Sequence, residues 1–121
     1  MTQRVHQKRR KADPARRLAY SALLAVETHG AYANLALADH LRAAKLTGRD
    51  AAFATELVDG TSRGTGTWDR LIEAASCRAP AKLQPGVRVV LRMAAHQILA
   101  MRVPPRACLL CTSAAAGAWG G

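Results

Sequence analysis

Cysteine and histidine are the residues of this chain most capable of metal binding or catalysis. Cys108 and Cys111, in "CLLC", have the spacing of half a zinc site, but a structural site takes four ligands and no second pair follows. Three cysteines, an odd number without an export signal, predict free thiols rather than a disulfide framework. The four histidines share no spacing, and no Ser or Cys lies in a nucleophile motif. We therefore expect no metal and no catalysis by this chain.

The glycines of "RGTGTW" do not match a nucleotide-binding motif. Asp69 occupies the position at which a dinucleotide-binding loop has its third glycine, and the segment follows a predicted helix instead of a strand. The stretch is better interpreted as a turn between helices, so we expect no cofactor.

The basic residues give the clearest functional indication. The chain has 18 Lys and Arg against 8 Asp and Glu, and most of the excess lies in residues 1–17. Neutralising phosphates releases condensed counterions, so this arrangement favours a polyanion; RNA or DNA is the first candidate, an acidic membrane the second, and a solubilising tail the alternative. The predicted RNA contacts are Arg4, Lys8, Arg9, Arg10, Lys11, Arg16 and Arg17, with Arg63 and Arg70 downstream.

Helices must position these side chains. Alanine and leucine are abundant while β-branched and aromatic residues are few, which predicts an all-α fold, and the length suits one domain. Residues 1–12 lack apolar periodicity and are expected to be a disordered arm. No apolar stretch is long enough for a membrane span and no secretory signal is evident, which predicts a cytoplasmic protein.

The first helix is predicted to begin at Pro14 with Asp13 as its cap and to end at Gly30. Arg16 and Arg17 lie largely off its apolar stripe, so we expect both on the solvent side. A second helix is expected to follow an Asn34 cap.

The stretch "RDAAFATELVDGTSRG" predicts a helix opened by a Thr47–Asp50 capping box. Gly60 within it would weaken the helix unless another helix packs closely there. Glu56 and Arg92 lie at the margins of stripes expected to face each other, so we predict a structural ion pair between them.

A fourth helix should bury Trp68, and the clearest pattern begins at Pro85 and runs to "VPP". Its apolar face is predicted to comprise Val87, Val90, Leu91, Ala94, Ala95, Ile98 and Met101. Arg88, Arg92 and His96 would then line the edge of that face.

Three stretches together resemble a known family: "ARRLAYSALLAVETHGAYANLAL", "RDAAFATELVDGTSRGTGTWD" and "LQPGVRVVLRMAAHQILAMRVPP". They are similar to the NusB-like domain that begins bacterial 16S rRNA cytosine-C5 methyltransferases of the RsmB (Sun/Fmu) type. NusB antitermination proteins share the fold with a looser sequence match.

The resemblance implies a compact bundle of about five to six helices that binds RNA, rRNA in particular, without catalysing a reaction. In full-length relatives a domain that binds S-adenosylmethionine and carries a cysteine nucleophile follows, and Cys77, Cys108 and Cys111 do not match its motifs. The alternative is a NusB-type antitermination factor that binds RNA together with a ribosomal protein.

The expected organisation is a basic arm at 1–12, a NusB-like RNA-binding domain at 13–105, and an atypical tail at 106–121. The similarity is expected to stop after Pro105, where "RACLLCTSAAAGAWGG" lacks a capping pattern. We hypothesise that the chain is a truncated or frame-shifted product.

Overall fold

The computed structural model describes residues 13–104, so the predictions for the arm and for residues 105–121 lie outside the described part. Five α-helices and one short 3-10 helix make up this part, with no strand among the described residues. They are α2 (Pro14–His29), α3 (Ala33–Ala44), α4 (Gly48–Arg63), α5 (Thr65–Ser76), η1 (Pro80–Lys82) and α6 (Pro85–Leu99). The predicted all-α fold is confirmed.

The ends of α2 follow the local signals in the sequence. The Asp13 carboxylate accepts hydrogen bonds from the backbone N–H groups of Ala15 at 2.9 Å and Arg16 at 3.3 Å, and Pro14 opens the helix. Gly30 ends it with a φ of 70°, a conformation in which a side chain would be strained. Both predicted ends are confirmed.

The caps of α3 and α4 differ from the prediction. The N-cap of α3 is Tyr32, and Asn34 already lies inside the helix. Thr47 is the N-cap of α4, as predicted, but its side chain makes no capping hydrogen bond. The capping box is therefore not formed, and these two helices depend more on packing than on their N-terminal caps.

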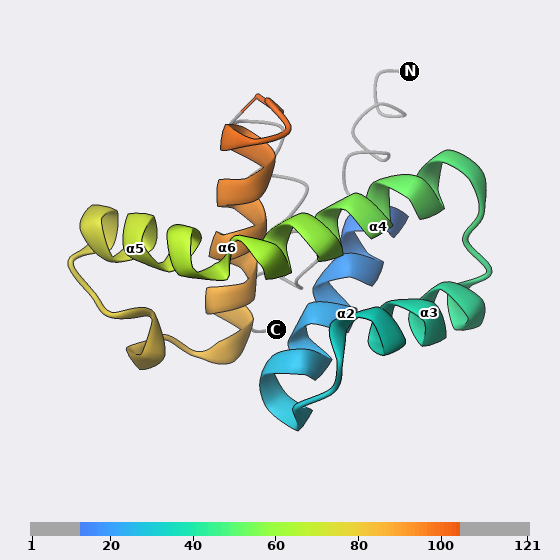
Figure 1. Cartoon of the computed structure of the whole chain (residues 1–121), viewed down its shortest axis with the longest axis horizontal. Coiled ribbons are helices and arrows are strands. Elements are labelled where there is room, and N and C mark those ends of the chain that lie inside the picture. The colour runs from blue at the N-terminus through green and yellow to red at the C-terminus, as the bar shows by residue number, and fades with distance from the viewer. Residues whose placement is uncertain (1–12, 105–121) are drawn as a thin grey trace, which may run out of the picture.

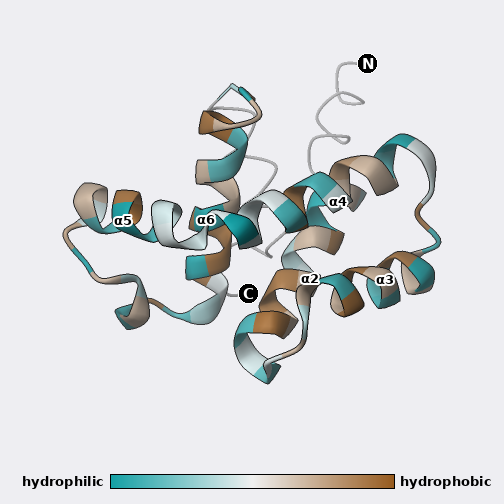
Figure 2. Cartoon of the chain, in the orientation of Figure 1, coloured by the Kyte–Doolittle hydropathy of each residue, from teal (hydrophilic) through white to brown (hydrophobic). Residues whose placement is uncertain are grey.

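Helices α2 and α4 lie at the centre of the described domain, and α4 contacts all four other α-helices. Helix α2 packs against α3, α4 and α6, whereas α5 packs mainly against α6 (Figure 1). Small side chains on the contact faces allow the helices to approach closely; Ala15, Ala19, Ala22 and Ala54 are fully buried. Hydrophobic and hydrophilic residues alternate along every helix, which is the pattern of helices with one buried face (Figure 2).

The buried face of α6 is rotated from the predicted one. Of the predicted face only Val90 and Ala94 are buried, and the other buried residues of α6 are Val89, Arg92, Met93, His96 and Gln97. A prediction from apolar periodicity assumes that polar side chains face solvent. That assumption fails on α6, because Arg92, His96 and Gln97 each bind a partner on a neighbouring helix and are buried. Arg92 and His96, expected at the edge, lie inside.

Close packing of α6 on α4 at Gly60 is confirmed. A Cβ atom at Gly60 would lie 2.1 Å from Cε1 of His96, so only glycine leaves room for the ring. The ring also packs edge-on to Trp68, with centroids 5.7 Å apart. Gly60 thus sets the distance between α4 and α6.

Replacing Gly60 with alanine should destabilise the domain. The added methyl group must displace the buried ring of His96, and overpacking of this kind costs about 1–3 kcal/mol, more than the gain in helix propensity. The matched control is Gly66→Ala, where no atom lies within 4 Å of the new Cβ and helix propensity should raise stability by about 0.5–1 kcal/mol. Urea unfolding followed by circular dichroism measures both; equal effects in the two variants would contradict the packing argument.

Candidate functional site

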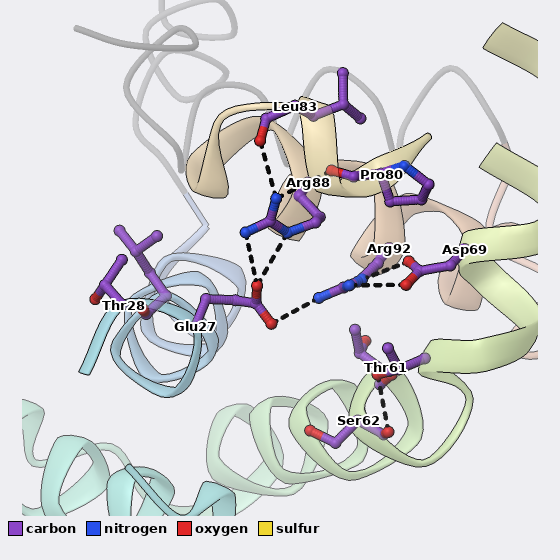
Figure 3. Close-up of polar contacts among 11 residues, drawn as sticks. Glu27, Thr28, Thr61, Ser62, Asp69, Pro80, Leu83, Arg88 and Arg92 are labelled. Carbon is purple, nitrogen blue, oxygen red and sulfur yellow. Dashed lines mark hydrogen bonds and ion pairs between the residues drawn. The ribbon is translucent and has the colours of Figure 1, made fainter. Parts of the chain in front are cut away.

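Arg92 joins three helices through a network of partly buried ion pairs. Its Nε and Nη2 donate to the two carboxylate oxygens of Asp69 on α5 at 2.7 and 2.9 Å. Its Nη1 donates to Oε2 of Glu27 on α2 at 2.8 Å (Figure 3). Because the Arg92 side chain is only 10% exposed, these contacts replace the water that its charge would otherwise need.

Arg88, one turn before Arg92, extends the network to the segment before α6. Its Nε donates to Oε1 of Glu27 at 2.9 Å. Its Nη1 donates to the carbonyl oxygens of Pro80 at 3.0 Å and Leu83 at 2.9 Å (Figure 3). The two arginines and two carboxylates balance in charge, so the network holds the connection around η1 without leaving a net buried charge.

Glu27 and Arg92, the central pair of the network, keep their charged forms. Burial raises the pKa of Glu27, but hydrogen bonds and charges from Arg92 and Arg88 outweigh burial and hold that pKa below its usual 4.5. Burial lowers the pKa of Arg92, and its bonds to Asp69 and Glu27 more than reverse this, leaving the pKa raised. Both groups are therefore ionised at neutral pH.

The predicted Glu56–Arg92 pair is wrong. Arg92 faces α2 and α5, and Glu56 instead lies 3.2 Å from Nε2 of His96, one turn further along α6. The side of α6 that meets α4 carries His96, since Gly60 makes space for its ring. Glu27 and Asp69 were not predicted from the sequence; the i, i+4 spacing of Arg88 and Arg92 was the one local signal for a shared acidic partner.

Arg16 is not on the solvent side of α2, as had been expected. Its Nε donates to Oε1 of Gln97 at 2.6 Å, and its Nη1 pairs with Asp13 at 2.6 Å. The guanidinium also lies over the Phe53 ring, 4.9 Å from its centroid. These partners offset the cost of burying Arg16 and leave little of it for a ligand.

The remaining described arginines of the predicted contact set are exposed: Arg17 on α2, Arg63 at the end of α4, and Arg70 on α5. None of the three forms an ion pair with another residue of the range 13–104. They lie on three different helices. The other predicted contacts, Arg4, Lys8, Arg9, Arg10 and Lys11, lie outside the described residues.

A small cavity lies next to the Arg92 network, between α2, α4 and α6. Its volume is about 180 Å³, and its walls combine apolar side chains with the polar groups of Glu27, Thr61 and Arg92. Thr61 is 2% exposed, and its hydroxyl has no hydrogen-bond partner among residues 13–104. A buried hydroxyl without a partner is uncommon and marks this cavity as a candidate binding site.

The described residues show no cluster of metal ligands. Within 13–104 no three His, Cys, Asp or Glu side chains come together as a metal-binding group. Cys77 is exposed and forms no disulfide, and the predicted free thiols Cys108 and Cys111 lie outside the described residues. None of the described helices combines the length and apolar character needed to cross a membrane.

These features define an all-α domain whose helices are joined by partly buried arginine–carboxylate pairs. The NusB family model matches residues 13–119, and the chain belongs to the NusB family. The resemblance inferred from the sequence is thereby confirmed. The matched range continues past Pro105, where the similarity had been expected to stop.

Two curated relatives come from Mycobacterium tuberculosis. The "Putative methyltransferase MT1451" of strain CDC 1551 and the "Putative methyltransferase Rv1407" of strain H37Rv are each 44% identical to this chain over 110 residues. The alignment covers 91% of this chain but 24% of either relative, so the chain corresponds to a minor part of a longer protein. No solved structure matches the chain.

Double-mutant cycles should separate the observed ion pairs from the predicted one. Arg92→Ala and Asp69→Ala should each lower the free energy of unfolding by about 2–4 kcal/mol, less than at a fully buried site because 28% of the Asp69 side chain is exposed. The Arg92 and Asp69 double variant should lose less than the sum. The control cycle pairs Arg92→Ala with Glu56→Ala and should be additive within about 0.5 kcal/mol. Chemical unfolding of all variants tests this; coupling in the control cycle alone would refute the network.

Proposed function

We propose that this domain binds RNA without catalysing a reaction on it, as the N-terminal module of rRNA cytosine-C5 methyltransferase-like proteins. The observation that carries the proposal is the NusB family match over residues 13–119, together with 44% identity to two proteins named as methyltransferases. The proposed RNA is rRNA. The chemistry, with its S-adenosylmethionine cofactor, would belong to the part of such proteins that this chain does not match.

The proposed RNA contacts are phosphate contacts by basic side chains. Arg4, Lys8, Arg9, Arg10 and Lys11 precede α2, and Arg17 is exposed in its first two turns. Arg63 and Arg70 extend the set to α4 and α5. Arg16 is removed from the set because its guanidinium is held by Asp13 and Gln97. Phosphate contacts position a protein on RNA without reading its sequence, so binding by these residues should depend steeply on salt.

The second candidate is an RNA–protein interaction factor of the antitermination type with a ribosomal protein partner. The match to the NusB family as a whole favours it, while the 44% identity to the two named methyltransferases favours the first. Retention of a defined ribosomal protein after deletion of residues 1–12 would support this second candidate.

Filter binding of the full chain to a structured 16S rRNA fragment, between about 50 and 200 mM salt, tests the proposal. Affinity should fall steeply with salt, and the slope should decrease by about one for each of Arg17, Arg63 and Arg70 replaced by alanine. Arg49→Ala is the matched control, since Arg49 is exposed near the opposite end of α4 from Arg63. Binding that ignores salt, or an Arg49 effect as large as that of Arg63, would argue against these contacts.

A further inference from the structure

We infer that the cavity between α2, α4 and α6 receives one unpaired RNA base, an inference that rests on the proposed RNA binding. The cavity volume is about 180 Å³, smaller than the roughly 300–1,000 Å³ of sites for drug-sized ligands. A single heterocyclic ring suits such a volume, with the sugar and phosphate remaining outside. Leu23, Val26 and Val89 supply apolar walls for the faces of the ring.

Thr61 supplies the strongest reason to expect a polar ligand in this cavity. Its hydroxyl is buried, lines the cavity, and has no partner among the described residues. Nearby Thr65 differs, because its hydroxyl already donates to the carbonyl oxygens of Thr61 and Ser62 at 3.2 and 3.0 Å. A ligand with a hydrogen-bonding edge would satisfy Thr61 and offset the cost of leaving it unpaired.

The charges around the cavity favour a neutral ligand that donates hydrogen bonds. Glu27 and Arg92 both line the cavity, with Thr61 on the neighbouring helix (Figure 3). Arg92 already donates to two carboxylates, so little of its charge is free to bind a phosphate or carboxylate. The ionised Glu27 carboxylate has more lone pairs than the arginines occupy, and can accept from a ring N–H or an exocyclic amino group. An alkyl ligand could not supply the hydrogen bond that the Thr61 hydroxyl lacks among the described residues.

Two exposed side chains lie directly next to cavity residues in the chain and suit the rest of a nucleotide. Tyr32 precedes Ala33, which lines the cavity, and is 74% exposed. Arg63 follows Ser62, another lining residue, and is also exposed. An exposed ring next to a base site can stack a neighbouring base, and a guanidinium can contact a phosphate. Stacking on an exposed aromatic ring and phosphate contacts by basic side chains are both features of single-stranded RNA recognition.

Short RNA oligomers with a single missing base test the inference on the full chain. Affinities for a cytidine pentamer and for the same pentamer with an abasic central nucleotide would be compared by fluorescence anisotropy at low salt. We expect the abasic oligomer, which keeps every phosphate, to bind about 5- to 10-fold more weakly. A difference of this size corresponds to the loss of the base's hydrogen bonds and apolar contacts in the cavity. Backbone amide NMR shifts induced by cytidine alone should centre on Thr61, Ala33 and Val89.

The matched variants are Thr61→Val and Thr55→Val. Both remove a hydroxyl from α4 with little change in shape, but the Thr55 hydroxyl donates to the carbonyl of Ala51 and does not line the cavity. Thr61→Val should bring the affinity for the intact pentamer close to that for the abasic one, while Thr55→Val should leave the difference unchanged. Equal affinity of wild type for both oligomers would overturn the base pocket and leave RNA binding intact. No binding of either oligomer would overturn the proposed function and, with it, this inference.

Discussion

The arrangement of the helices depends on one buried cation, the guanidinium of Arg92. A charge with 10% exposure requires partners, and it finds them in Glu27 of α2 and Asp69 of α5. This requirement fixes the positions of α2, α5 and α6 relative to one another. If one of these helices shifted by a residue, Arg92 could no longer bind both Asp69 oxygens and Glu27 at once. Arg88 ties the segment around η1 to the same carboxylate. Apolar packing supplies the bulk of the stabilisation, and the network selects among the packed arrangements.

The candidate base pocket is a consequence of this network. Glu27 and Arg92 hold each other at one wall, so neither can turn to fill the cavity. Thr61 and Ser62 of α4 also line the cavity. Gly60, one residue earlier, accepts the ring of His96 and so determines how far α6 stands from α4. The distances between helices that accommodate these polar groups thereby leave a cavity whose walls are partly apolar and partly hydrogen-bonding.

Local signals predicted the ends of α2 and the start of α6, but not the N-cap of α3 or the long-range partners of the buried polar residues. Asp13 acts through its own carboxylate, and Pro14, Gly30 and Pro85 act through their own backbone, so the sequence alone located α2 and the start of α6. Arg16, Arg92 and Gln97 are buried because they bind groups that lie tens of residues away in the sequence. Apolar periodicity does not include such partners, so it predicted Arg16 on the solvent side of α2 and Arg92 at the edge of the predicted apolar face of α6. The family was predictable because its motifs combine several such constraints. The cavity was not, since a missing partner for Thr61 is visible only once the neighbouring helices are in place.

The most direct test of this account is the protonation of Glu27, followed by carbon-detected NMR of its side-chain carboxyl across an acid titration of the full chain. The pKa of Glu27 should lie below its usual 4.5, because Arg92 and Arg88 stabilise the carboxylate more than burial penalises it. A lowered folded-state pKa means that the stabilisation is present above the unfolded-state value and is lost as pH falls through the folded-state value. Replacing Arg92 with glutamine should raise the Glu27 pKa. A Glu27 pKa at or above 4.5 that this substitution leaves unchanged would contradict the central role of the network.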